Sequence, residues 1–226
     1  MDNRLKKILD DNVEKFSEWT GAISEYNTMF NSGRDLSQDE QVHLCYKAAG
    51  VLGSISELYI KYGAFKDNFD CSKMFIPFDG IITIIKSSKT GCEFNLGFDN
   101  SCLYIETSMK HPENLRYMND GYYRDLLSLM ELGDFKLQEN EQYGFETTKR
   151  YEKVMKNNQS KIFTIMRNYF IGIVENEKGI LLGNFHIGWP FETNFYDAIY
   201  KGCLAFKILY RLNYLLWKTT AIQAKK

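Results

Sequence analysis

Proline is scarce in this sequence: the chain has 3 prolines among 226 residues, and none of them falls between Asn194 and Lys218. An excess of charge is also lacking, because 28 lysines and arginines stand against 29 aspartates and glutamates. This balance argues against a protein that binds nucleic acids mainly through charge. The longest uncharged apolar runs, such as 179–191, are too short to span a bilayer. We therefore expect a soluble protein with no membrane partner.

Paired cysteine motifs are missing as well, and we expect no secretion signal. The charged start MDNRLKKILDDNVEKF contains no apolar core of signal-peptide length. No CxxC spacing occurs among the five cysteines, which are Cys45, Cys71, Cys92, Cys102 and Cys203. An odd number of thiols without a secretion signal predicts reduced cysteines and a cytoplasmic protein.

Motifs that bind phosphates or metals are equally absent. The chain has no GxxxxGK[ST] or GxGxxG string, so nucleotide binding through a phosphate loop has no support. His43 and Cys45 lie two residues apart, but no second pair of metal-ligand type lies nearby. We predict no cofactor and no metal site.

Aromatic residues, in contrast, are abundant. The 16 phenylalanines, 15 tyrosines and 3 tryptophans make up 15% of the chain. Such a content predicts a large buried aromatic core, an adhesive surface, or both.

The stretch 179–218 predicts a buried strand, a turn at Pro190 and a long helix that is apolar around most of its circumference. Asn194, with Asp197 three residues later, is typical of a helix start. Asn213 and Gly202 fall on the apolar side, where the amide requires a partner and the glycine allows close approach of another backbone. An aromatic row borders the polar sector of this helix and is either the rim of the core or a partner-binding strip. Its members are Tyr196, Tyr200, Tyr210, Tyr214 and Trp217.

The amino-terminal part, 1–62, predicts a helical hairpin. Apolar residues recur every three or four positions over 3–30, with Asn12 filling the one gap, which indicates a single amphipathic helix. Ser37 and Glu40 form a capping-box pattern, and a second helix is expected to continue to about Lys61. Because the linker between them is short, the two helices should be antiparallel neighbours.

Period-two patterns begin after this hairpin. Ile81 to Ile85 predicts a buried strand, and 92–98 with 103–109 predicts a β-hairpin closed by a two-residue loop at 100–101. This register pairs Leu96 with Ile105 on an apolar face and Asn95 with Glu106 on a wet face.

The second half of the chain leaves one alternative open. A helix is expected over about 122–132, ended by Gly133, and the polar stretch 138–161 is predicted to be an insertion and the mobile part. The segment 161–187 favours a second hairpin with Gly172 opposite Gly183, although 160–174 also allows a helix. In total we predict one α+β domain over 1–226. In it, 75–218 form an antiparallel sheet of about five strands backed by helices, with a long carboxy-terminal helix.

The order of these elements resembles that of type III secretion chaperones and the related YbjN-like proteins. The resemblance lies in YYRDLLSLMELGDFKL and in the later YFIGIVENEKGILLGNFHIGWPFETNFYDAIYKGCLAFKILYRL. It covers most of 38–218 and rests on topology and hydrophobic pattern. The amino-terminal helix, the 138–161 insertion and the balanced charge depart from that family. The resemblance implies a non-catalytic intracellular protein that binds a partner protein, and it transfers no functional residue.

Two carboxylates supply the main enzymatic alternative. Glu93 and Glu106 fall on the same sheet face and could hold Mg²⁺ in a metal-dependent hydrolase or nuclease. The lysine that such sites usually place two residues after the acid is absent, so a solvated sheet face is the favoured interpretation. His186 has no serine or cysteine elbow to activate, which favours a core or edge histidine.

The preferred hypothesis is a non-enzymatic protein-binding module, either chaperone-like or toxin-neutralising like an immunity protein. Its partner is another protein, and a second copy of the chain is an alternative. The rival hypothesis is the hydrolase that uses Glu93 and Glu106. A third is a small-molecule receptor between the sheet and the last helix.

Overall fold

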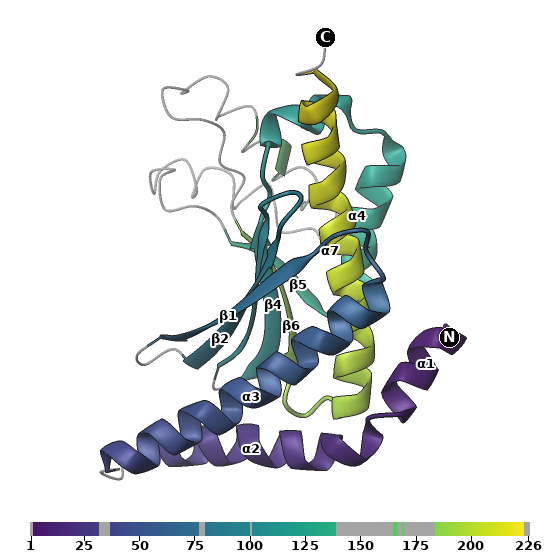
Figure 1. Cartoon of the computed structure of the whole chain (residues 1–226). Helices are drawn as coiled ribbons and strands as arrows, with labels where there is room; N and C mark the ends of the chain where they lie inside the picture. Colours follow the sequence, from purple (N-terminus) through teal and green to yellow (C-terminus); the bar gives the residue numbers. More distant parts are fainter. Residues whose placement is uncertain are drawn as a thin grey trace, which may run out of the picture.

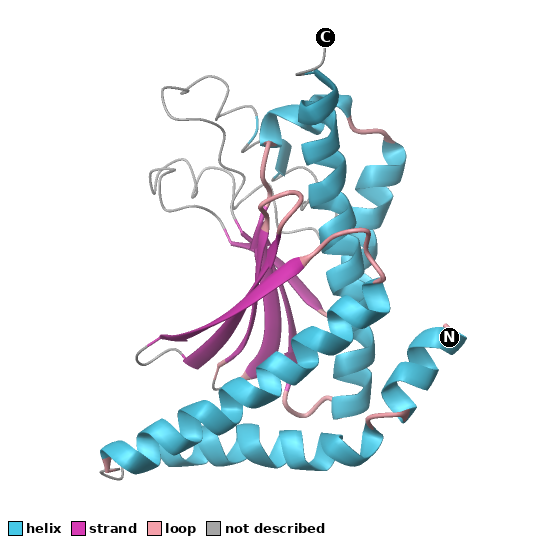
Figure 2. Ribbon diagram, in the orientation of Figure 1, coloured by secondary structure: helices cyan, strands magenta, loops and turns pink. Residues whose placement is uncertain are grey.

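The computed structural model describes residues 2–31, 37–76, 80–99, 101–138, 165–166, 169 and 184–223. These residues form an α+β fold in which helices gather on one side of a single sheet (Figures 1 and 2).

The sheet is antiparallel throughout, and its spatial order is β1-β2-β3-β4-β6-β5. The strands are β1 (Phe69–Ile76), β2 (Gly80–Ser87), β3 (Glu93–Phe98), β4 (Cys102–Ser108), β5 (Asp134–Gln138) and β6 (Asn184–Pro190). The predicted sheet is confirmed, and the described residues contribute six strands to it where the sequence indicated about five. Strands β1 and β5, which were not predicted, lie at its two edges.

The predicted β3–β4 hairpin has the expected register. Leu96 pairs with Ile105 and Asn95 pairs with Glu106. Burial alternates along β4, because Leu103, Ile105 and Thr107 are buried and the residues between them are half-buried. The period-two pattern therefore placed the correct residues on the core face.

Helix α7 (Phe195–Gln223) packs on the core face of the sheet (Figure 1). The ring of Phe206 lies edge-on to that of Phe94 on β3, with centroids 5.1 Å apart. The side-chain oxygen of Asn194 accepts hydrogen bonds from the backbone N–H groups of Tyr196 and Asp197, as the capping pattern predicted. The buried amide of Asn213 has its partner too, since its Oδ1 accepts from the N–H of Lys110 at 3.2 Å.

The helical hairpin consists of α2 (Val13–Asn31) and α3 (Gln38–Gly63), which lie side by side (Figure 1). Both halves of the capping box at Ser37 and Glu40 are present. Tyr26 of α2 packs edge-on against Phe98 of β3, with centroids 5.3 Å apart. The hairpin thus packs onto the sheet of its own chain.

The prediction of one unbroken helix over 3–30 is wrong. Helix α1 (Asn3–Asp10) ends before Asn12, whose N–H and side-chain amide donate to the carbonyls of Leu9 and Ile8. The break lets α1 turn away from α2 (Figure 1). Its apolar residues Leu5 and Leu9 become fully buried, and α1 contacts α3 and α7.

The predicted second hairpin is corrected as well. Strand β6 lies between β4 and β5, so both of its edges are occupied over Asn184–Gly188. The described residues of the upstream segment, Ile165, Met166 and Tyr169, are helical. Its glycine pair, Gly172 and Gly183, lies outside the described residues. The 138–161 insertion also lies outside them, except for Gln138 at the end of β5.

The remaining elements connect the sheet to the helices. They are the 3₁₀ helix η1 (Pro112–Tyr117) and α4 (Asp120–Leu132), and α4 lies beside α7. Among the helices of the described ranges, none combines the length and apolar character that a membrane crossing needs.

Candidate functional site

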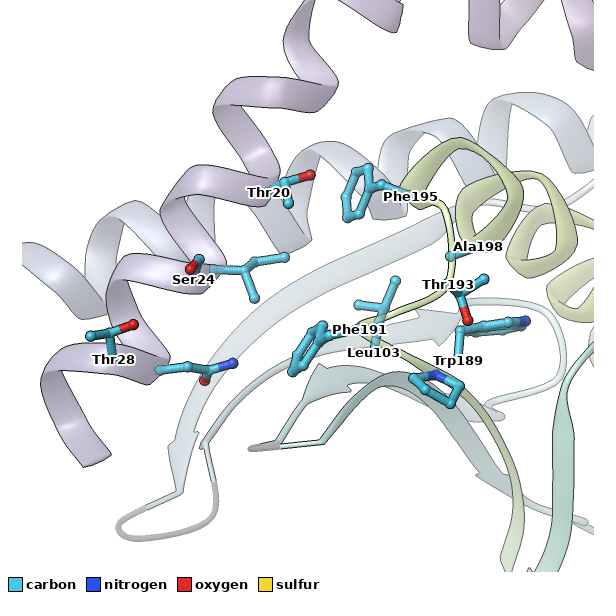
Figure 3. A pocket seen from close by; sticks show the side chains of 12 residues that line it. Thr20, Ser24, Thr28, Leu103, Trp189, Phe191, Thr193, Phe195 and Ala198 are labelled. Carbon is cyan, nitrogen blue, oxygen red and sulfur yellow. The ribbon is translucent and has the colours of Figure 1, made fainter. Parts of the chain in front are cut away.

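A groove of about 380 Å³ opens between α2, the end of β6 and the start of α7 (Figure 3). The residues that line it come from three parts of the chain that are distant in sequence. They are Thr20, Ile23, Ser24, Asn27, Thr28, Leu103, Trp189, Pro190, Phe191, Thr193, Phe195 and Ala198. The volume lies within the range of about 300–1,000 Å³ that is usual for binding pockets.

One wall of the groove is a row of hydroxyl groups on α2. Thr20, Ser24 and Thr28 are each four residues apart, so they lie along one line on the helix surface (Figure 3). The hydroxyl of Thr20 donates to the carbonyl of Phe16 at 2.7 Å, which leaves its oxygen able to accept a further hydrogen bond.

The opposite wall is aromatic. Trp189 is 2% exposed, and its Nε1 donates to the carbonyl of Leu132 at 2.7 Å, so the indole is held in place. Phe191 is 40% exposed. Phe195 lies edge-on to Phe16 of α2, with centroids 5.6 Å apart. This wall therefore combines a fixed buried ring with one that faces solvent.

Acidic residues are sequence neighbours of the lining residues, although none of the lining side chains is ionisable. Glu192 stands between the lining residues Phe191 and Thr193, and Asp197 precedes Ala198. The carbonyl of Asp99 accepts a weak hydrogen bond from Asn27 at 3.5 Å. Burial opposes ionisation of the Asp99 carboxyl, but hydrogen bonds from Ser101 and Cys102 hold its pKa below the ordinary value. The segments that line the groove, 20–28, 99–103 and 189–198, therefore carry acidic residues and no basic ones.

None of the five members of the predicted aromatic row of α7 lines this groove. Tyr196 and Tyr200 are half-buried, and the hydroxyl of Tyr196 donates to Asp10 at 3.1 Å. Tyr214 and Trp217, also half-buried, pack against each other with centroids 5.5 Å apart. Tyr210, between the two pairs, is only 7% exposed.

Asp67, in the α3–β1 connection, holds the side chain of Tyr210 in place. Its hydroxyl donates to Oδ2 of Asp67 at 2.8 Å, and the hydroxyl of Ser87 donates to the same oxygen at 2.5 Å. Burial and then the Asp67 contact raise the pKa of the Tyr210 phenol. Its polar group therefore serves this internal contact.

The two glutamates of the hydrolase hypothesis have separate partners. Glu93 forms an ion pair with Lys86 at 2.7 Å. Glu106 accepts a hydrogen bond from Asn95 at 3.1 Å, and its other oxygen lies 3.7 Å from Nδ1 of His186, too far for a hydrogen bond. The nearby imidazole and the Asn95 amide, against the opposing effect of burial, hold the pKa of the Glu106 carboxyl below its usual range.

His186 lies on the half-buried sheet face, with the ring of Tyr104 stacked on it at a centroid distance of 5.0 Å. Cys102 is on the same face, but burial and then the Asp99 carboxylate raise the pKa of its thiol to about 11. A thiol in this state is a poor nucleophile at neutral pH. Within the described ranges, no three His, Cys, Asp or Glu side chains converge to hold a metal ion.

Comparisons of the chain with models of known protein families, with curated proteins and with solved structures found no match.

Sequence reasoning did not find the groove. The four-residue spacing of Thr20, Ser24 and Thr28 was one available signal, because hydroxyls in line on an otherwise amphipathic helix form a polar seam. Phe191, an aromatic residue directly after the Pro190 turn, was another. Nothing local, however, indicates that these two segments face each other.

Proposed function

We propose that this protein is a non-catalytic, cytoplasmic protein-binding module, and that the groove beside α2 receives a segment of its partner. A chaperone-like role and a toxin-neutralising role both fit this proposal. All five cysteines are free thiols, which is consistent with a reducing compartment.

The groove itself is the observation that carries the proposal. Aromatic residues are enriched at the centres of protein interfaces, where they contribute most of the binding energy. Phe191 is such a residue, since a large ring is 40% exposed at the edge of a preformed hollow. The facing hydroxyl row offers donors and acceptors to a partner's backbone (Figure 3).

One part of the predicted order supports the resemblance to type III secretion chaperones and YbjN-like proteins, namely an antiparallel sheet followed by a long closing helix. The predicted order was a helix, three strands, a helix, two strands and a helix, whereas the described residues place four strands, β1 to β4, before α4. In this proposal the aromatic row of α7 supplies a second contact region through Tyr196, Tyr200, Tyr214 and Trp217, with Tyr210 beneath it.

The hydrolase that would use Glu93 and Glu106 has less support. Lys86 already neutralises Glu93, and Glu106 is engaged by Asn95 and lies beside His186. Metal-dependent cleavage of DNA or RNA that disappears in Glu93→Gln and Glu106→Gln would favour this rival function.

Site-specific crosslinking tests the proposal. A photo-crosslinking amino acid replaces Ser24 in the groove, and the matched control replaces Tyr46, which is 72% exposed on α3 and does not line the groove. We expect one protein adduct of defined mass from position 24 in the native cells, absent from position 46. The adduct should be lost when Thr28→Trp fills the groove.

Two results would overturn the proposal: identical adducts from both positions, or no protein adduct from position 24. An adduct of the chain with itself would identify a second copy as the partner.

A further inference from the structure

We propose that the partner segment is an extended, basic peptide whose uncharged apolar side chain enters the groove. This inference rests on the proposed function and specifies the chemistry of the partner.

The interior of the groove selects an uncharged anchor. Its twelve lining residues include no Asp, Glu, Lys, Arg or His. A charged group placed there would lose its hydration without gaining a counter-charge, which is costly. An aliphatic or aromatic side chain would instead pack against Phe191, Phe195 and Leu103.

The surroundings of the groove select positive charge next to that anchor. The three segments that contain all twelve lining residues, 20–28, 99–103 and 189–198, contain no Lys, Arg or His. They carry four acids, which are Glu25, Asp99, Glu192 and Asp197. Glu25 is already paired with Lys47 at 2.5 Å, and the carboxylate of Asp99 accepts hydrogen bonds from Ser101 and Cys102, so Glu192 and Asp197 set the local charge. Lysine or arginine beside the anchor would complement them.

The hydroxyl row fits an extended chain. Residues four apart on a helix are separated by about 6 Å along its axis. Alternate residues of an extended peptide repeat every ~6.6 Å. In a peptide running along α2, the backbone groups of every second residue can therefore lie opposite Thr20, Ser24 and Thr28 (Figure 3).

The experiment measures the affinity of the full chain for three labelled, end-blocked nonapeptides by fluorescence anisotropy. Each has a central leucine in a serine-glycine background, and the flanking positions are lysine, glutamate or serine. We expect the lysine peptide to bind at least tenfold more tightly than the glutamate peptide and to weaken as salt rises from 50 to 300 mM. Replacing its leucine by aspartate should abolish binding.

Two matched variants connect this selectivity to the groove. Glu192→Gln should weaken the lysine peptide about threefold and leave the serine peptide unchanged. Glu18→Gln, an exposed position of α2 that does not line the groove, should change neither.

Equal affinities for the lysine and glutamate peptides, no detectable binding, or full binding by Thr28→Trp would each overturn the inference. The proposed function fails separately. A protein crosslinked from position 24 through an acidic segment would refute the basic peptide alone, whereas the absence of any crosslinked protein would remove both.

Discussion

Tyr59 of α3 occupies the space that the missing side chain of Gly202 leaves on α7. A β-carbon at position 202 would overlap the tyrosine hydroxyl and lie 2.6 Å from Cζ of the ring. Tyr59 is fully buried and stacks on Phe206, with centroids 5.9 Å apart, so the ring has little freedom to move aside. This contact fixes how closely α3 and α7 approach each other.

Gly202→Ala should therefore lower the free energy of unfolding by about 1–3 kcal/mol, the usual cost of overpacking a core. Urea unfolding measures the effect. Gly50→Ala is the control, because a β-carbon at this position in α3 would have no heavy atom within 4 Å. The control should gain up to about 1 kcal/mol from helix propensity. Equal changes in the free energy of unfolding for Gly202→Ala and Gly50→Ala would show that the Tyr59 ring does not require a glycine at position 202.

Tyr59→Phe tests the same contact from the other side. The Tyr59 hydroxyl is buried and has no hydrogen-bond partner within the described residues. Since a buried unsatisfied hydroxyl costs about 1–3 kcal/mol, its removal should leave stability unchanged or raise it by about 1 kcal/mol. A clear loss of stability in thermal unfolding would contradict the absence of a partner.

Asp67 connects three elements through its carboxylate. It accepts hydrogen bonds from Tyr210, Ser87 and the N–H of Lys89, the last at 3.0 Å. Asp67→Ala should cost about 2–3 kcal/mol, because it leaves these donors without their charged acceptor. Tyr210→Phe, which removes only one donor, should cost about 1 kcal/mol.

The exposed Asp70 on β1 provides the control for this pair, and Asp70→Ala should stay within about 0.5 kcal/mol of the parent protein. Chemical denaturation of the three variants gives the ranking. A cost for Tyr210→Phe as large as that for Asp67→Ala would mean that the tyrosine alone carries the connection.

The sequence predicts those elements whose pattern is local. The β3–β4 register follows from strict alternation, and the start of α7 follows from Asn194 and the apolar residues behind it. Strand β1 was missed because FDCSKMFI does not alternate, as is common for an edge strand with mixed surroundings. Strand β5 was missed because it has only five residues, which give an alternating pattern little length. The break at Asn12 leaves the apolar spacing intact, so no periodicity could indicate it.

The groove depends on tertiary structure more than these helices and strands do. Its two walls, around Ser24 and Phe191, are separated by most of the chain. They meet only because β6 inserts between β4 and β5, which places the β6–α7 turn beside α2. The sequence pattern instead favoured a hairpin for the residues before β6, and that topology gives no reason to bring the two walls together.

Glu106 should make stability depend on pH. Its carboxyl has a folded-state pKa below the ordinary value, so its stabilising contribution is present above the unfolded pKa of about 4.3 and is lost as pH falls through the folded pKa. Wild type should therefore exceed Glu106→Gln in stability at pH 6, and the difference should shrink steadily towards pH 3. Urea unfolding at pH 6, 5, 4 and 3 measures this difference.

Glu93→Gln serves as the comparison for that titration. The pKa of Glu93 is also lowered, first by Lys86, but both side chains of this pair are about half exposed. Because solvent screens this pair, the stability difference between wild type and Glu93→Gln should be smaller than that between wild type and Glu106→Gln. A constant difference between wild type and Glu106→Gln from pH 6 to pH 3 would show that ionisation of Glu106 contributes nothing to stability.

Phe191 and Trp189 line the same wall of the groove, but Phe191 should matter mainly for peptide binding and Trp189 mainly for folding. Trp189 is buried and donates a hydrogen bond to the carbonyl of Leu132. Trp189→Ala should therefore lower the free energy of unfolding by about 3–5 kcal/mol and impair every function of the chain. Phe191 is 40% exposed, and its replacement by alanine should cost less than about 1 kcal/mol. Phe191→Ala should nevertheless weaken the lysine peptide at least tenfold, because an exposed ring at the edge of a groove contributes to binding more than to folding. Thermal unfolding and anisotropy on the same preparation check both statements, and unchanged peptide affinity in a folded Phe191→Ala protein would place the partner elsewhere.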